Sequence, residues 1–201
     1  MSPHGTDAYR DVTGLPPLVG RAVSAARQAG FGSSCLPAHG RLLQLLAGGI
    51  GAGVIGETGT GCGVGLAWLA SGARTGVRLI SIEKDEQRAG LARSVFAGVP
   101  AVTVLHGDWR ELQAGGPFEL LAVDGGGQGK GAAEAALCPR DWLAPGGMLV
   151  LDDFTPVAGW PPVRDGQPDT ARLHWLQHPD LLATQIRTQP DACSIVAALA
   201  G

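Results

Sequence analysis

Val54-Ile-Gly-Glu-Thr-Gly-Thr-Gly-Cys-Gly-Val-Gly65 is the most informative stretch of this chain. Its apolar beginning is typical of the end of a buried strand, and Leu66-Ala-Trp-Leu-Ala70 after it is typical of the start of a helix. Glycines lie between the two, and glycine allows positive φ angles and has no Cβ to keep a ligand away from the backbone. The unpaired N–H groups at the start of the helix favour an anionic or hydroxyl-rich ligand. The stretch therefore predicts a ligand site built on a strand, a glycine loop and a helix.

The spacing of the acid and the glycines narrows the class of ligand. The dinucleotide fingerprint G-x-G-x-x-G/A does not fit in any register, since its last position falls on Val64, Leu66 or Trp68. A nicotinamide-dependent oxidoreductase is therefore disfavoured. The order is instead E-x-G-x-G-x-G, with Glu57 two residues before Gly59. This order is similar to motif I of the class I methyltransferases that use S-adenosylmethionine (SAM).

Composition and charge restrict the class of protein. The length of 201 residues suits one domain with a substantial core, and a net charge of −3 does not suggest a nucleic-acid or anionic-membrane surface. The chain has no apolar stretch of the ~18 residues needed for a spanning helix, and its N-terminus has no signal-peptide pattern. Its four cysteines form no C-x-x-C motif, which predicts reduced thiols in a cytoplasm. We expect a cytoplasmic protein with one domain over residues 1–201, made of a helical cap (1–48) and an α/β core (49–201).

The hydrophobic pattern predicts a parallel sheet covered by helices. Two helices are expected before the glycine loop, at residues 18–29 and from about Pro37 to residue 46, either as a packing pair or as a lid over the cofactor. After the loop, strands and helices alternate, as in a doubly wound sheet. The expected strands lie at 77–82, 102–105, 118–123 and 148–151. Two helices are expected to end near residues 71 and 97, and two more are expected at 132–137 and 170–177. A turn is expected at 141–147 and a loop at 155–168.

Two more strands are expected at the end of the chain, at 181–187 and 193–199. The link between them is shorter than the dozen or so residues that a parallel crossover needs, so they should pair antiparallel. Together with the earlier strands they predict an α/β, doubly wound, Rossmann-like fold, with a seven-stranded sheet and the last strand antiparallel.

Each of the first five strands ends in, or runs into, at least one acidic residue. These residues are Glu57, Glu83, Asp108, Asp124, and Asp152 with Asp153. Ligands of open α/β sheets bind beyond the carboxyl ends of the strands, so the acids should gather around one crevice. Glu83 lies 20 residues after Gly63, where nucleotide-binding folds place a carboxylate for the ribose hydroxyls. The alternative for Glu83 is a solvated acid beside Lys84.

The run from His39-Gly-Arg-Leu-Leu43 through the glycine loop to Leu151-Asp-Asp153 resembles the catechol and caffeoyl-CoA O-methyltransferase group, from about residue 33 to the C-terminus. The resemblance implies SAM-dependent O-methylation of a small-molecule acceptor, and it leaves a homodimer open. It also implies that Gly107-Asp108-Trp109 holds the adenine, although Trp109 is equally well explained as a core aromatic residue. The cofactor-binding residues implied in this way are Glu57, Gly59, Gly61, Gly63, Glu83, Lys84, Gly107, Asp108, Trp109 and Asp124.

The same resemblance implies a divalent cation. Asp124 and Asp152 match the two metal-binding aspartates of the group, and Asp153 falls where the group usually has an asparagine. An all-oxygen set of this kind suits Mg²⁺, Mn²⁺ or Ca²⁺, and we expect the three carboxylates to converge around such an ion. The alternative is that Asp124 orients the substrate or SAM and that Asp152 only ends its strand.

The catalytic base of the group is missing. The group has a lysine three residues after its first metal-binding aspartate, whereas this chain has Gly127 there and its nearest lysine at Lys130. The residues left to handle the proton of the acceptor are Asp124, Asp153 and His174. His174 shares a helix face with His178, but no third zinc ligand accompanies them. A SAM- or nucleotide-binding protein of this fold without transferase activity is therefore the alternative function.

Overall fold

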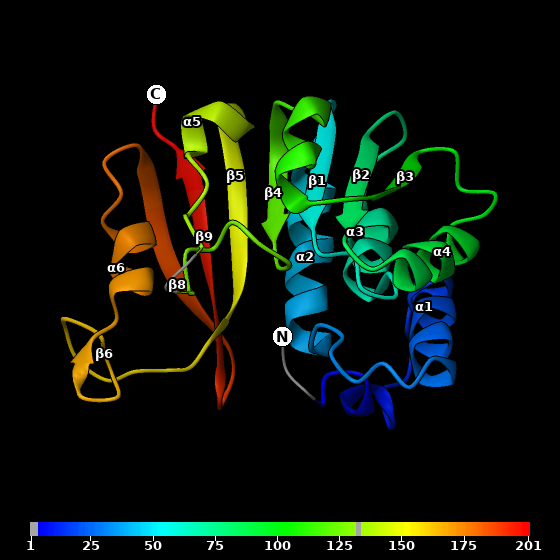
Figure 1. Ribbon diagram of the computed structural model, residues 1–201, viewed down its shortest axis with the longest axis horizontal. Helices are drawn as coiled ribbons and strands as arrows, with labels where there is room; N and C mark the ends of the chain where they lie inside the picture. The colour runs from blue at the N-terminus through cyan, green and yellow to red at the C-terminus, as the bar shows by residue number, and fades with distance from the viewer. Residues whose placement is uncertain (1–3, 132–133) are drawn as a thin grey trace.

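The computed structural model describes residues 4–131 and 134–201 (Figure 1). Within them, seven strands form one sheet in the order β3-β2-β1-β4-β5-β9-β8. These strands are β1 (Val54–Thr58), β2 (Arg78–Glu83), β3 (Val102–His106), β4 (Phe118–Val123), β5 (Leu143–Phe154), β8 (Leu181–Gln189) and β9 (Ala192–Leu199). Neighbours from β3 to β5 pair in parallel, and β9 pairs antiparallel with both β5 and β8. The predicted doubly wound, seven-stranded sheet with an antiparallel last strand is confirmed.

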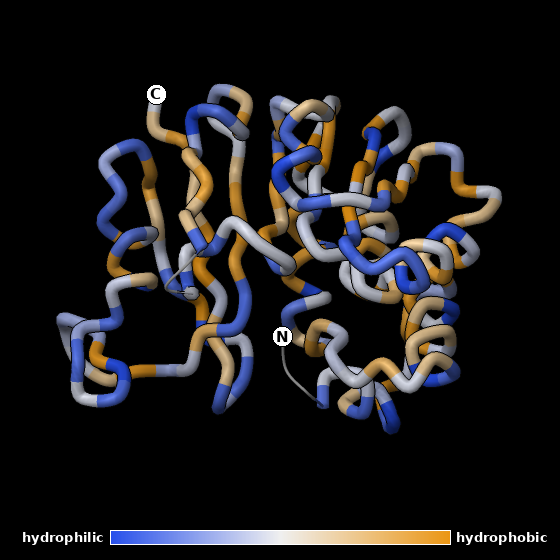
Figure 2. The backbone as a smooth tube through the Cα atoms, viewed as in Figure 1, coloured by the Kyte–Doolittle hydropathy of each residue, from blue (hydrophilic) through white to orange (hydrophobic). Residues whose placement is uncertain are grey.

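The two faces of the sheet bury separate hydrophobic clusters, because side chains alternate along each strand. On β4, Leu120 belongs to the cluster under the first four helices, whereas Leu121 belongs to the cluster that includes Trp142 and Trp175. The helices are α1 (Pro17–Gln28), α2 (Pro37–Gly49), α3 (Val64–Gly72), α4 (Glu86–Val95), α5 (Pro139–Trp142) and α6 (Thr170–Leu176), with 3₁₀ turns η1 (Asp7–Tyr9) and η2 (Trp109–Gly115). Figure 2 shows the central strands as mainly hydrophobic segments.

The first two helices are a packing pair. Helix α3 is apolar on all sides and therefore needs cover on all sides, which α1, α2 and β2 supply. The indole of Trp68 lies against Gly40 of α2, where a Cβ would overlap the ring. None of the helices within residues 4–131 and 134–201 has the length and hydrophobicity needed to cross a bilayer.

Three local predictions are wrong. Residues 134–137 of the expected helix at 132–137 are not helical, and residues 132 and 133 lie outside the described part of the chain. The expected turn at 141–147 instead contains the end of α5 and the start of β5, because Leu143 pairs with Phe118 of β4, a partner that local composition cannot reveal. At Gly147 a Cβ would crowd the carbonyl of Phe118, so glycine permits this pairing. The expected loop at 155–168 contains the hairpin of β6 (Val163–Arg164) and β7 (Gln167–Pro168).

Candidate functional site

Three neighbouring hollows lie at the carboxyl edge of the sheet, within the described residues. The β2 hollow, of about 160 Å³, includes Phe31, Gly59, Glu83, Lys84, Gly107, Asp108 and Trp109. The glycine-loop hollow includes Phe31, Ser34, Cys35, Glu57, Gly59, Gly61 and Asp124. The β5 hollow, of about 240 Å³, is lined by Leu36, Asp152, Asp153, Phe154, Thr155, Asp191 and Ala192. The first two hollows share residues, and Leu36 of the third directly follows Cys35 of the second, so the three follow one another along residues 31–36.

The glycine loop turns sharply between β1 and α3. Gly59, Gly61 and Gly63 have φ angles of 83°, 54° and 90°, which other residues rarely adopt. The N–H of Gly59 donates to the carbonyl of Ile82 at 2.9 Å, which ties the loop to β2. A Cβ at Gly59 would overlap the backbone of Gly125, in the loop after β4. The predicted glycines therefore lie together at the sheet edge and bring two loops into contact.

Glu83 ends β2 beside the glycine loop. Its side chain is buried, and its Oε2 accepts a hydrogen bond from the N–H of Gly61 at 2.7 Å. Its Oε1 accepts from the N–H of Asp85 at 3.0 Å and from Nη2 of Arg88 at 2.8 Å. Arg88 was not predicted from the sequence, and the capping carboxylate of Asp85 fixes its backbone in the first turn of α4. An arginine five residues after the strand-end acid, just past a helix cap, was the available signal.

Two further acids border the glycine-loop hollow. Glu57 is buried and accepts a hydrogen bond from Oγ of Ser81 at 2.6 Å. Burial raises the pKa of Glu57 well above its usual range, and the charges of Asp124 and Glu83 act in the same direction. Asp124 follows β4, and burial together with the charge of Asp152 raises the pKa of Asp124 to about 6. A cationic ligand in this hollow would favour the charged form of both carboxyl groups.

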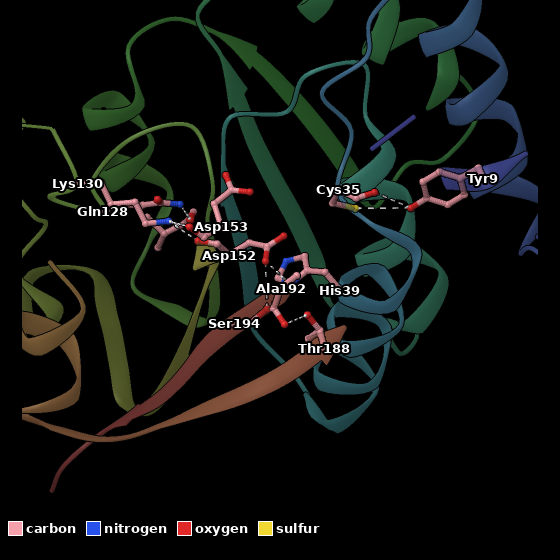
Figure 3. Close-up of polar contacts among 11 residues, drawn as sticks. Tyr9, Cys35, His39, Gln128, Lys130, Asp152, Asp153, Thr188, Ala192 and Ser194 are labelled. Carbon is pink, nitrogen blue, oxygen red and sulfur yellow. Dashed lines mark hydrogen bonds and ion pairs between the residues drawn. The ribbon is translucent and has the colours of Figure 1, made fainter. Parts of the chain in front are cut away.

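Asp152 belongs to a buried polar network at the β5 hollow. Its Oδ1 accepts a hydrogen bond from the Ser194 hydroxyl of β9 at 3.2 Å and lies 3.5 Å from Nδ1 of His39 on α2. Nδ1 of His39 lies 2.9 Å from Oγ of Ser194, and burial lowers the pKa of His39. Figure 3 shows the Asp152 side chain directed toward His39 and Ser194. This network was not predicted from the sequence, because its members are far apart in the chain.

Lys130 reaches Asp152 from its other side (Figure 3). The ammonium donates to the backbone carbonyls of Asp152 and Asp153, at 3.0 Å for the second, and it lies 4.0 Å from the centre of the Phe154 ring. Burial lowers the pKa of Lys130 to about 8, although the charges of Asp152 and Asp124 act in the opposite direction. The lysine of the 124–131 loop therefore lies directly beside the predicted metal ligands.

Comparisons with known proteins identify the family. A family model described as a methyltransferase domain matches residues 57–154. A catechol O-methyltransferase of Mycobacterium tuberculosis is 32% identical over 203 residues, which cover 93% of this chain and 90% of that protein. The chain belongs to the class I SAM-dependent O-methyltransferases. It is thus an enzyme that transfers a methyl group from SAM.

Solved structures share the fold of this methyltransferase. A cofactor-bound structure of a protein from MTB is 27% identical, with a TM-score of 0.73, over 99% of this chain and 98% of that chain. The O-methyltransferase TomG from Streptomyces achromogenes, solved in complex with SAM, is 21% identical, with a TM-score of 0.71, over 98% of this chain and 96% of that chain.

The metal site predicted for the methyltransferase does not form. Within residues 4–131 and 134–201, no three His, Cys, Asp or Glu side chains are placed to hold a metal ion. The expected convergence of Asp124, Asp152 and Asp153 is therefore wrong. Asp152 instead faces His39, and the Lys130 ammonium occupies the backbone oxygens at this strand end. In the described part of the chain, the arrangement of these donors therefore does not fit the divalent cation that the family resemblance implied.

Trp109 both borders the β2 hollow and packs against the core. Its ring lines the β2 hollow of the methyltransferase, as an adenine contact requires. The same ring packs on Trp142, with centroids 5.7 Å apart, against the core cluster of that face. Asp108 beside it caps η2 by accepting from the N–H of Arg110 at 3.0 Å. The predicted segment therefore lies at the ligand edge, and its tryptophan is also part of the packing.

His174 lies away from the three hollows at the sheet edge. It lines a separate surface hollow of the methyltransferase with Thr170, Leu173, Gln177, His178 and Pro179. Its ring meets that of His178 at right angles, with centroids 5.3 Å apart, which agrees with the predicted shared helix face. This hollow shares no lining residue with the three hollows at the sheet edge. The structure brings Asp124 and Asp153 to the carboxyl edge of the sheet, but it does not bring His174 there.

Residues 31–36, here called the strap, were missed by the sequence analysis. The strap connects α1 to α2 and contributes to all three hollows of the methyltransferase. The N-terminal turn holds it: Oγ1 of Thr6 donates to the carbonyl of Phe31 at 2.6 Å, and the Tyr9 hydroxyl donates to the carbonyl of Cys35 at 3.0 Å. Nε1 of Trp68 in turn donates to the Tyr9 oxygen at 2.9 Å. The connection between α1 and α2 therefore borders the three hollows at the sheet edge.

Replacing Tyr9 by phenylalanine is expected to lower the free energy of unfolding by about 1–3 kcal/mol, the usual cost of an unsatisfied buried polar group. The change leaves the N–H of Trp68 and the carbonyl of Cys35 without this partner. Urea denaturation followed by tryptophan fluorescence measures the effect. The control is Arg10→Ala, which removes an exposed side chain from the adjacent position. Equal stability of the two variants would show that the hydroxyl does not hold the strap.

Proposed function

We propose that this O-methyltransferase binds SAM across the β2 and glycine-loop hollows and methylates a hydroxyl group of a small molecule held in the β5 hollow. The observation that supports this assignment best is the order of the three hollows along the strap. The adenosine part, the methionine part and the acceptor of a methyl-transfer complex must follow one another in this order. A ligand that spans the first two hollows would present its sulfonium group near Asp124, between them and the β5 hollow.

Each part of the cofactor has a set of residues in this assignment. Glu83 accepts the ribose hydroxyls, and Lys84, Gly107, Asp108 and Trp109 surround the adenine. Gly59, Gly61 and Gly63 let the backbone approach the methionine part, because no side chain intervenes. Glu57 and Asp124 balance the positive charge of the ligand, since their buried carboxyl groups gain most from a nearby cation.

The reaction is a single displacement at the methyl carbon. A lone pair of the acceptor oxygen forms the new C–O bond, while the C–S bond breaks and its electron pair stays on sulfur, which gives S-adenosylhomocysteine. The hydroxyl proton passes to a carboxylate at the strand ends, for which Asp124 and Asp153 are the candidates. The protein contributes mainly by holding oxygen, carbon and sulfur in line.

A two-part experiment tests the proposal. Calorimetry should show binding of S-adenosylhomocysteine and no binding of NAD. Incubation with SAM and a panel of catechols, phenols and aliphatic alcohols should then release S-adenosylhomocysteine with at least one acceptor class. Binding without turnover over the panel would favour the alternative of a SAM-binding protein without transferase activity, and absence of binding would contradict the site itself.

The remaining expectations concern the whole protein. We take residues 1–201 as one catalytic domain, with the N-terminal residues as its cap. Cys35, Cys62, Cys138 and Cys193 are all free, which supports a reducing compartment such as the cytoplasm. The homodimer stays a prediction, and light scattering of the purified enzyme measures it.

A further inference from the structure

The family resemblance implies a divalent cation beside the acceptor, yet the carboxylates of this chain do not assemble a site for one. We propose that the Lys130 ammonium supplies the positive charge at this position and that this methyltransferase works without a metal. The inference rests on the assignment of the β5 hollow to the acceptor. In this role the ammonium donates a hydrogen bond to the acceptor oxygen and keeps its own protons, while the hydroxyl proton goes to the carboxylate base.

The position of the ammonium is the first argument. Lys130 donates to the carbonyls of Asp152 and Asp153, so Nζ lies at the strand end from which metal ligands would project. Nζ also lies over the ring of Phe154, and Phe154 lines the β5 hollow. Within the described residues, two of its three N–H groups have hydrogen-bond partners. One N–H group therefore remains for an acceptor oxygen.

Charge is the second argument. Asp152 and Asp124 are the carboxylates that act most strongly on the ammonium of Lys130. Two carboxylates that repel each other need a positive charge near them, and the ammonium provides one that is covalently attached. A divalent ion brought to the same place would meet this ammonium at short range and be repelled by it. The extra acid at Asp153, where the family usually has a neutral asparagine, adds negative charge at the same strand end.

The third argument is that the loop carrying Lys130 is held in place. Gln128 is buried, and its side-chain amide donates to the backbone carbonyl of Val123. The backbone carbonyl of Gln128 accepts a hydrogen bond from Nε1 of Trp175 at 2.9 Å. Gly129 has a φ angle of 68°, and a Cβ there would press on Ala136. The glycines that distinguish this loop from the family let it fold back with the lysine three residues later. One local rearrangement thus accounts for the glycine-rich loop and for the displaced lysine.

Binding of Mn²⁺ and enzyme turnover together test the inference. The wild-type enzyme is expected to leave Mn²⁺ free in electron paramagnetic resonance titrations up to about 1 mM, the weak end of protein sites for hard cations. Its turnover should be the same with EDTA as with added Mg²⁺. Lys130→Met should lower kcat roughly ten- to a hundredfold, as expected for a lost charge-assisted hydrogen bond, and affinity for S-adenosylhomocysteine should stay within about threefold. Lys130→Arg keeps the charge and should retain more activity than Lys130→Met.

The control variant is Arg78→Met, which removes an exposed positive charge at the amino end of β2, away from the site. Equal unfolding midpoints for the Lys130 variants and the control establish that the lower kcat of Lys130→Met does not come from a loss of folded protein. Tight binding of Mn²⁺ by the wild-type enzyme, with activity lost in EDTA and restored by Mg²⁺, would overturn the inference. So would a Lys130→Met enzyme as active as the control. If the wild-type enzyme failed to bind S-adenosylhomocysteine, the proposed function would fail. The Mn²⁺ titration would still show whether a divalent cation binds beside Lys130.

Discussion

Glu83→Ala is expected to weaken binding of S-adenosylhomocysteine roughly ten- to a hundredfold or more, because a hydrogen bond to a charged group contributes about 1.5–3 kcal/mol. The carboxylate of Glu83 is 5% exposed and borders the β2 hollow, where the ribose hydroxyls are proposed to bind. The same carboxylate accepts from the N–H of Gly61 and from Arg88. Its removal therefore also loosens the glycine loop and leaves Arg88 with its longer ion pair to Asp85, at 3.6 Å.

Calorimetric titration with S-adenosylhomocysteine measures the change in affinity. The matched control is Glu86→Ala, which removes an exposed acid three residues further on, in the first turn of α4. If the Glu83 variant bound the ligand as tightly as the control, Glu83 would not belong to the ribose site.

Arg172→Ala is expected to give the largest loss of stability, about 3–5 kcal/mol in the free energy of unfolding, because it leaves a buried charge without its partner. Arg172 is 1% exposed and pairs with Asp169, which is 7% exposed, at 2.9 Å. The guanidinium also donates to the carbonyl of Thr155 at 2.7 Å and to the side chain of Gln185. It thereby joins α6 and β8 to the segment that follows β5.

Denaturation in guanidinium chloride measures this loss. The control is Arg140→Ala, which breaks an ion pair with Asp180 of similar geometry, 2.6 Å, at the surface. Exposed pairs contribute little, since water and salt screen them, so the control should unfold close to the wild-type midpoint. Equal losses in the two variants would show that the buried pair contributes no more than a surface one.

Local patterns were sufficient to predict most of the fold and the positions of the glycine loop and of the strand-end acid Glu83. The placement of Glu83 follows from an apolar strand that ends in an acid, and the antiparallel pairing of β8 and β9 follows from their short link. The glycines at 59, 61 and 63 have the positive φ angles that their spacing suggested. In each of these cases the deciding interaction lies within a few residues or follows directly from strand order.

The predictions that failed depend on partners distant in sequence. The start of β5 resembles a turn in composition, and the pairing of Leu143 with Phe118 of β4 outweighs that preference. The order of strands places Asp152 at the sheet edge, but it does not reveal that the side chain faces His39 and Ser194. The contact of Lys130 with the end of β5 likewise depends on how the glycine-rich loop folds back. Side-chain direction is therefore the information that spacing alone does not contain.

The strap has a thermodynamic consequence, because Cys35 borders the proposed methionine position and the adjacent Leu36 borders the acceptor position. A ligand that favours one arrangement of the strap changes the affinity for a ligand that binds on its other side. Such cooperativity is reciprocal, so the acceptor would raise the affinity for SAM by the same factor by which SAM raises the affinity for the acceptor. Loss of the methyl group from the cofactor leaves both products against one shared segment, and departure of either would ease departure of the other.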